Sequence, residues 1–207
     1  MNSAGHDLPA RVEVKVCRPG FGASCALCCG SHNYDADPAA IGALFARRAR
    51  ILKYYQPEYL LRMARASRSP LTGSYYFSGM DFMEGDIRKI YDNGARCPFV
   101  AFTGMAQVGC GINEGIPCLK RDCIMSYQGK NFSCRAGEVL SREEILFAAE
   151  LCGDWYHYGI LIQRGEMIRD LMRRRPLSQA AREEIFSRLE KIVREDLSLH
   201  LMADYFS

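Results

Sequence analysis

The feature of this sequence best suited to chemistry is its set of ten cysteines among 207 residues. Nine of them fall into two groups, and the tenth, Cys152, stands apart. The groups are Cys17, Cys25, Cys28 and Cys29, and then Cys97, Cys110, Cys118, Cys123 and Cys134. Thiolates are the ligands that zinc and iron–sulfur clusters prefer. In a reducing compartment, dense cysteines more often bind metal or do redox chemistry than form a disulfide framework.

The first group contains a C-x2-C turn, Cys25 to Cys28, inside the glycine-rich stretch GFGASCALCCG. Such a turn places two thiolates on one metal, and the glycines free the backbone to direct amides at sulfur. Adjacent side chains such as Cys28 and Cys29 point in different directions in most backbone conformations. We therefore expect one of them to bind the first metal and the other to serve a second metal, a bridge or packing.

The second group is spread through a glycine- and proline-rich stretch that begins at Cys97. A C-x2-C turn must find its remaining ligands at distant positions, and this group supplies them. We therefore expect both groups to contribute to one metal site. The spacings match neither the ferredoxin patterns nor a paired C-x2-C zinc ribbon, so both zinc and an iron–sulfur cluster stay open.

At these residues the chain resembles a family of zinc- or iron-chelating cysteine-cluster domains with the pattern C-x2-C-x2-C-C, followed further on by C-P-F-[LV] and two more cysteines. Here GASCALCC and CPFVAFTGMAQVGCGINEGIPC stand in the corresponding places, and the resemblance covers about residues 17–135. It implies metal chelation through the cysteines that match the family's pattern: Cys25, Cys28, Cys29, Cys97, Cys110 and Cys118.

One departure from the family concerns its first cysteine, whose place is taken by Gly22. Cys17 and Cys123 are the candidate replacements. The predicted metal ligands are therefore Cys25, Cys28, Cys29, Cys97, Cys110, Cys118 and Cys123. A flagellin lysine methylase carries a similar cluster, and together with the surplus of cysteines this favours an iron–sulfur cluster over zinc.

Other residues give weaker signals for chemistry. His32 follows the first group and is either a nitrogen ligand or, as we expect, a surface or hydrogen-bonding residue. Cys152 and His157 lie in helical sequence and are expected to pack, with Cys152 behaving as a small hydrophobe. No phosphate-binding loop, dinucleotide fingerprint, zinc-protease motif or nucleophile elbow is present, so no catalytic residue is assigned.

The segment between the two groups is predicted to be helical. Asp37 and Pro38 are typical of an N-cap and first helical residue, and an apolar 3.6-residue period continues to Tyr55. A shorter helix is expected over Tyr59–Met63. We expect the arginines of this region to form a solvated helix face; they are Arg47, Arg48, Arg50, Arg62, Arg65 and Arg68.

Short apolar runs predict a small amount of β structure. Cys97–Phe102 and Val108–Ile112 flank the turn TGMAQ and are expected to form a hairpin that carries Cys97 and Cys110. The alternation over Val12–Val16 predicts one more strand.

The last third of the chain predicts three helices within residues 141–200. Ser141 and Glu144 form a capping box, a second apolar stripe runs from Trp155 to Met172, and Ser178 caps a third helix. The fold class is therefore mainly α with a small β-hairpin, in which a loop-rich cysteine cluster packs on a helical subdomain. We expect residues 1–135 to form the metal-binding region and residues 136–207 the helical subdomain, both within one compact unit.

Composition excludes several classes of protein. With 48% hydrophobic and 25% charged residues the chain is globular, and a net charge of +3 favours neither nucleic acid nor a membrane surface as partner. We expect a cytoplasmic protein, because neither an export signal nor an apolar membrane span is evident. The predicted role is structural, electron-transferring or sensing; the alternatives are a metal-dependent or iron–sulfur enzyme and a zinc-stabilised module that binds an unknown protein.

Overall fold

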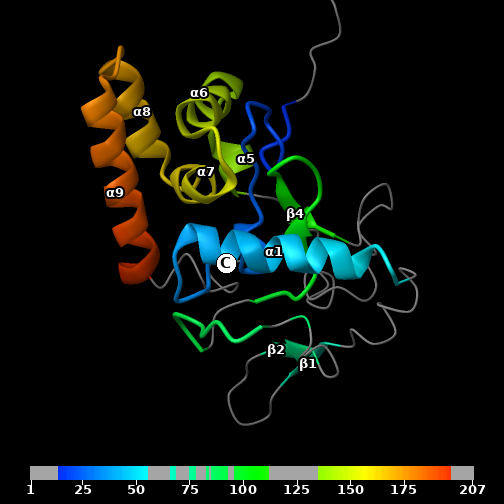
Figure 1. Cartoon of the computed structure of the whole chain (residues 1–207). Helices are drawn as coiled ribbons and strands as arrows, with labels where there is room; N and C mark the ends of the chain where they lie inside the picture. Colours follow the sequence, from blue (N-terminus) through cyan, green and yellow to red (C-terminus); the bar gives the residue numbers. More distant parts are fainter. Residues whose placement is uncertain are drawn as a thin grey trace, which may run out of the picture.

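The computed structural model describes residues 14–55, 66–68, 75–77, 83, 85–92, 96–111 and 135–196. A long helix, α1, crosses the middle of the molecule, and the C-terminal helices gather on one side of it (Figure 1). A short hairpin and the cysteine-bearing loops lie against α1. This arrangement is mainly α with a small β content, as the sequence predicts.

The described elements follow one another along the chain in a simple order. They are the 3-10 turn η1 (Leu27–Cys29), α1 (Pro38–Leu52), β1 (Ala66–Arg68), β2 (Tyr75–Phe77), β3 (Val100–Phe102), β4 (Val108–Cys110), α5 (Arg135–Val139), α6 (Arg142–Cys152), α7 (Trp155–Leu161), α8 (Gly165–Arg173) and α9 (Gln179–Glu195). The strands form two antiparallel pairs, β1 with β2 and β3 with β4. The predicted helix over 59–63 lies outside the described residues.

Helix α1 begins where the sequence predicts and ends slightly earlier. Asp37 accepts a hydrogen bond from the Ala40 amide at 2.8 Å, and Pro38 occupies the first helical position. The Phe45 ring packs between two parts of the fold, because it lies 6.2 Å from the Phe102 ring of β3 and 5.2 Å from the Trp155 ring of α7. Helix α1 therefore joins the hairpin to the C-terminal helices.

The C-terminal helices confirm the predicted caps. Ser141 accepts from the Glu144 amide at 3.2 Å, while the Glu144 carboxylate accepts from the Ser141 amide at 2.6 Å. Ser178 caps α9 by accepting from the Ala181 amide at 3.2 Å.

The prediction of a single helix from Trp155 to Met172 is wrong, because two helices, α7 and α8, occupy this stretch. The amides of Gln163 and Arg164 bond three residues back instead of four, and Arg164 leaves the helical region with φ −120° and ψ 63°. An ion pair from Arg164 to Asp196, just beyond α9, accompanies this break. The apolar stripe continues on both sides of the break, so the apolar period of the sequence could not predict it.

The predicted hairpin is present, although its strands are shorter than the apolar runs. Val100 pairs with Cys110 and Phe102 pairs with Val108. Cys97 lies just before β3, while Cys110 is the last residue of β4. The strand predicted over Val12–Val16 is not formed in its described part, since the Arg18 amide bonds back to the Lys15 carbonyl and turns the chain.

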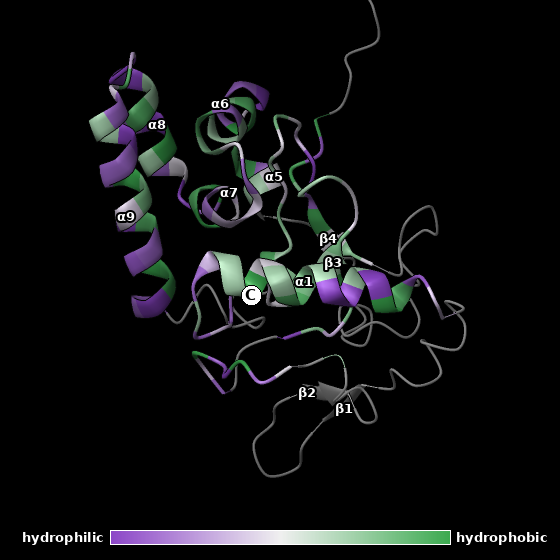
Figure 2. Ribbon diagram, viewed as in Figure 1, coloured by the Kyte–Doolittle hydropathy of each residue, from purple (hydrophilic) through white to green (hydrophobic). Residues whose placement is uncertain are grey.

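The core contains side chains from the cysteine-bearing loops, from α1 and from the C-terminal helices. Its fully buried members include Leu27, Ile41, Phe45, Tyr158 and Leu189. Helix α9 alternates hydrophilic and hydrophobic positions along its length, as expected for a helix with one buried face (Figure 2). A division of the chain near residue 135 stays a prediction. None of the described helices is long and apolar enough to cross a bilayer.

The loop before the first cysteine pair packs on the turn between α6 and α7. Gly20, Phe21 and Gly22 all have positive φ, at 109°, 56° and 78°. A Cβ built on Gly22 would lie 2.8 Å from the Gly153 carbonyl oxygen, whereas a Cβ on Gly20 meets nothing within 4 Å. Gly22 therefore serves a close approach of two backbones, and a cysteine at this position would collide with α6–α7.

We predict that Gly22→Ala destabilises the fold more than Gly20→Ala. Both changes place a Cβ at positive φ, which costs about 1 kcal/mol or more. Only Gly22→Ala adds a clash with a main-chain oxygen, worth roughly a further 1–3 kcal/mol. Urea unfolding of the two variants measures the difference, and equal losses would contradict the close packing of the loop on Gly153.

Candidate metal centre

The described part of the first cysteine group is built around a tight turn. The amides of Cys29 and Gly30 donate to the carbonyls of Ala26 and Leu27 at 3.0 and 2.8 Å, which forms η1. This turn brings the Cys28 and Cys29 sulfurs to 3.9 Å. The expectation that these neighbours point apart is wrong, because the 3-10 conformation places their thiols side by side.

The two adjacent thiols share a hydrogen bond that separates their acidities. Their contact lowers the pKa of Cys28 and raises that of Cys29, because the protonated thiol of one donates a hydrogen bond to the thiolate of the other. Burial also raises the pKa of Cys29, followed by the charges of Cys28, Cys97 and Cys110. Cys28 therefore loses its proton more easily than an isolated thiol, and Cys29 keeps its proton more firmly.

The second group reaches the first through the backbone. The Cys97 amide donates to the Cys29 carbonyl at 2.9 Å, and Cys110 is held opposite Val100 by the β3–β4 pairing. Both Cys97 and Cys110 are close enough to Cys29 for their charges to affect its ionisation. The structure therefore places next to one another the chain segments that carry four of the predicted ligands, which are Cys28, Cys29, Cys97 and Cys110.

Hydrogen bonds join the segment that follows the first cysteine group to residues 88–91. The Asn33 amide group donates to the Tyr91 carbonyl and accepts from the Tyr91 amide, both at 2.9 Å, as a strand neighbour would. The Asp35 amide donates to the Arg88 carbonyl at 2.8 Å. Asn33 is fully buried, which limits the access of water to its two bonds with Tyr91.

A second connection joins the loop before Cys25 to the hairpin. The buried Ser24 hydroxyl accepts from the Val108 amide at 2.7 Å. Arg18 donates to the Thr103 hydroxyl at 2.8 Å. The first cysteine group is thus fixed to the strand that ends in Cys110.

The remaining predicted ligands have different surroundings. Cys25 is half-buried against the core, and its amide donates to the carbonyl of the exposed Cys17 at 3.1 Å. Cys118, Cys123 and Cys134 lie outside the described residues. Cys152 is half-buried on α6, where burial raises the pKa of its thiol far above the usual range, which agrees with an inert packing role.

The donor types of the site fit a soft metal, and one spacing fits as well. In a tetrahedral site with metal–sulfur bonds of about 2.3 Å, neighbouring sulfurs are about 3.8 Å apart, close to the 3.9 Å between Cys28 and Cys29. Among the described residues, however, no three Cys, His, Asp or Glu side chains are grouped so that they could hold a metal ion. Coordination would therefore need rotation of these thiols or a ligand from outside the described residues.

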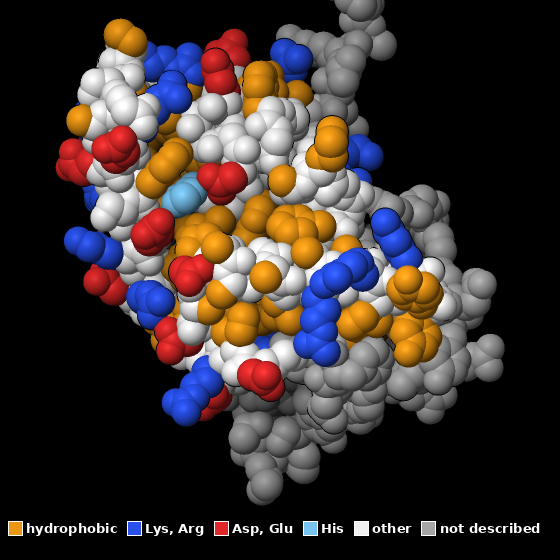
Figure 3. All heavy atoms as spheres, viewed as in Figure 1, with side chains coloured by type: hydrophobic (Ala, Val, Ile, Leu, Met, Phe, Trp, Pro, Cys, Tyr) orange, Lys and Arg blue, Asp and Glu red, His pale blue; other side chains and the backbone are white. Residues whose placement is uncertain are grey.

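A charged residue that the sequence argument misplaced lies next to the cysteines. Arg48 was expected on a solvated face together with Arg47 and Arg50, yet it is fully buried. Arg47 and Arg50 are exposed, and Lys and Arg side chains gather over the visible face of α1 (Figure 3). Arg48 lies on the buried stripe of α1, three residues after Phe45 and four residues before Leu52. This helical spacing is the sequence signal that could have predicted its burial.

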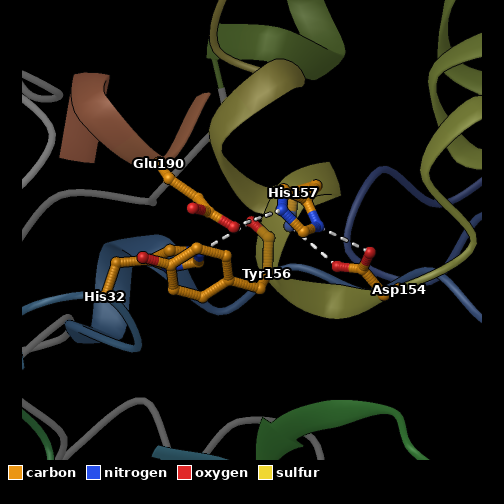
Figure 4. Close-up of polar contacts among 5 residues, drawn as sticks. All are labelled: His32, Asp154, Tyr156, His157 and Glu190. Atoms are coloured by element: carbon orange, nitrogen blue, oxygen red, sulfur yellow. Dashed lines mark hydrogen bonds and ion pairs between the residues drawn. The ribbon is translucent and has the colours of Figure 1, made fainter. Parts of the chain in front are cut away.

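His32 is a hydrogen-bonding residue and is buried rather than at the surface. Its Nε2 lies 2.9 Å from the Tyr156 carbonyl, which can only accept, so Nε2 donates and Nδ1 accepts from the Ser31 hydroxyl at 2.8 Å. Figure 4 shows the ring beneath α7. Gly159 leaves room for it, because a Cβ there would lie 2.6 Å from His32 Cε1. Both ring nitrogens are thus engaged, and the Nε2 bond holds the first cysteine segment to α7.

His157 links α7 to α9 by polar and ring contacts. Its amide and Nδ1 donate to the two oxygens of Asp154 at 2.7 and 2.8 Å, and Nε2 lies 3.4 Å from Glu190 Oε1 (Figure 4). The ring stacks on Phe186 with centroids 4.3 Å apart. Burial alone would lower the pKa of His157, but Asp154 and then Glu190 outweigh burial and raise it.

Comparison with known proteins gives no relative for this site. No family model, no curated protein and no solved structure matches the chain. The resemblance to the chelating cysteine-cluster family therefore stays a prediction.

We predict that Asp154→Asn lowers the pKa of His157 and reduces stability at acidic pH. Because the folded pKa is raised, the pair stabilises the fold fully below the unfolded value of about 6.5 and loses this effect as pH rises through the folded value. Asparagine caps a helix as well as aspartate, so the change removes mainly the charge. The pair is partly exposed, so the expected loss is roughly 0.5 kcal/mol.

NMR titration of the His157 ring and urea unfolding at pH 5.5 and 8.5 measure this effect. The variant should lose more stability at pH 5.5 than at pH 8.5. An unchanged histidine pKa, or equal losses at both pH values, would contradict the assigned pairing.

Proposed function

We propose that the two cysteine groups together bind a soft metal centre through their thiolates. The observation that carries this proposal is the meeting of the two groups at the Cys29–Cys97 backbone contact. The side chains that would hold the metal are those of Cys28, Cys29, Cys97 and Cys110, with Cys25, Cys118 and Cys123 as further candidates. Core packing alone does not require cysteines from such distant segments to lie near one another.

The metal is proposed to be iron in an iron–sulfur cluster, with zinc as the alternative. The surplus of cysteines favours a cluster, whereas the Cys28–Cys29 sulfur spacing suits two thiolates on any one tetrahedral ion. When bound, the metal would supply either a cross-link between the two segments or a one-electron carrier. The proposed role is accordingly structural, electron-transferring or sensing.

A cytoplasmic location agrees with this proposal, because reducing conditions keep the thiols available for metal. The experiment that tests the proposal is anaerobic purification followed by absorption spectroscopy and metal analysis. Visible sulfur-to-iron absorption with matching iron and sulfide identifies a cluster, and stoichiometric zinc without colour identifies a zinc site. A chain that takes up neither metal refutes the proposed function.

We predict that Cys97→Ser and Cys28→Ser each release the metal and destabilise the fold by several kcal/mol. Serine keeps the size of the side chain but is a poor soft-metal ligand, and the binding energy of a structural site is also folding energy. Cys152→Ser is the matched control, since it also changes a half-buried thiol, and it should leave metal content unchanged. Metal stoichiometry and thermal midpoints across the three variants provide the measurement.

A second arm of this experiment asks whether both groups serve the same site. Loss of all metal in each of Cys28→Ser and Cys97→Ser is expected for a shared site. Retention of full metal by either variant would exclude that residue as a ligand, and retention by both would refute the shared site.

A further inference from the structure

The side chain of Arg48 is the largest fully buried one among the described residues, and it is charged. Its guanidinium is surrounded by neutral oxygens rather than by a carboxylate. Nε donates to the Met83 carbonyl at 2.7 Å, and Nη1 donates to the Tyr34 hydroxyl at 2.8 Å and to the carbonyls of Cys97 and Val100 at 3.2 Å. None of the ion pairs between described residues includes Arg48.

The remaining nitrogen of this group, Nη2, is buried without any hydrogen-bond partner. A buried guanidinium without an opposite charge is costly, and neutral oxygens offset only part of that cost. An unexplained positive charge at such a place points to a negative charge that acts close by.

One source of negative charge close to this guanidinium is the cysteine group. Nη1 contacts the carbonyl of Cys97, and three bonds join that carbonyl carbon to Sγ, so covalent geometry keeps this sulfur within about 8 Å of the guanidinium. Cys97 in turn bonds to Cys29 through its amide. A second positive charge lies near the first: the guanidinium of Arg96 is 4.6 Å from the centre of the Tyr34 ring, and that of Arg48 is 5.7 Å from it.

We propose that Arg48 is the built-in counter-charge of the cysteine site, so that the site takes a metal centre whose net charge is negative. This inference rests on the proposed function. Four thiolates around a divalent ion, or around an iron–sulfur cluster, leave such a negative charge. Arg48 would not ligate the metal; it would stabilise the thiolate-bound centre from the α1 side.

The alternative is that Arg48 only ties main-chain carbonyls together, and three variants separate the two roles. Arg48→Lys keeps the charge but loses the planar fork of donors. Arg48→Gln removes the charge and keeps a short donor. Arg50→Gln is the matched control, because Arg50 lies exposed on the same helix.

The main measurement is the affinity of each folded, chelator-treated variant for Zn²⁺ in competition with a chromophoric chelator. We expect Arg48→Gln to weaken zinc binding about tenfold or more, as removal of a charge at this range implies. Arg48→Lys should stay within about threefold of the parent, and Arg50→Gln should not differ from it. A folded Arg48→Lys protein that loses as much affinity as Arg48→Gln would overturn the proposal. If Arg48→Gln does not fold, the Arg48→Lys variant decides. Near-parental zinc affinity of folded Arg48→Lys supports the proposal, and a tenfold loss of affinity overturns the proposal.

A second measurement keeps this inference separate from the proposed function. In chelator-treated protein at pH 7, alkylation of Cys97 and Cys110 by neutral iodoacetamide reports the negative charge on these sulfurs without any metal. Slower alkylation in Arg48→Gln than in the parent and in Arg48→Lys supports the counter-charge even for a chain that binds no zinc or iron. Where no metal binds, equal rates in parent and Arg48→Gln would overturn it.

Discussion

The hydrogen bonds of the buried Arg48 side chain hold the cysteine-bearing half of the molecule together. From α1 it reaches Met83, Tyr34, Cys97 and Val100, which come from three separate stretches of chain. Short strands and loops have few backbone partners of their own, and a guanidinium can bind several of their carbonyls at once. Together with the packing of Phe45 on Phe102, this side chain therefore sets the position of the second cysteine group relative to α1.

The C-terminal helices provide the fixed surface on which that half is built. The rings of Phe45 and Trp155 join α1 to α7, and His32 bonds to the α7 backbone beside them. Tyr158 adds a hydrogen bond from its hydroxyl to the Val16 carbonyl at 2.7 Å. Through these contacts α7 fixes the chain on both sides of the first cysteine group, so a loop-rich segment keeps a defined course.

The thiols themselves occupy an intermediate position between a packed core and an open site. Cys28, Cys29, Cys97 and Cys110 are all half-buried, and the acidity of Cys29 responds to the other three. Fully buried thiols would be inert, and fully exposed ones would lack neighbours to complete a metal site. Partial burial, the meeting of the two groups and a buried cation are the observations on which the proposed metal binding rests.

The sequence by itself determined the local structure of this protein. The caps at Asp37, Ser141 and Ser178 and the apolar period between them located α1, α6 and α9, because these signals act within a few residues of the chain. The hairpin around residues 103–107 followed from its turn for the same reason. The ligand candidates were also visible in the sequence, since a thiol is a soft donor whichever fold carries it.

Only the tertiary structure decided which of these residues meet. The contact between Cys29 and Cys97 joins positions separated by all of α1, and no local pattern encodes the register that Asn33 sets with Tyr91. The break between α7 and α8 arises from backbone bonding that leaves the apolar stripe intact. The burial of Arg48 was decided by carbonyls that converge from distant segments, because a charge leaves water only where the folded chain supplies such partners.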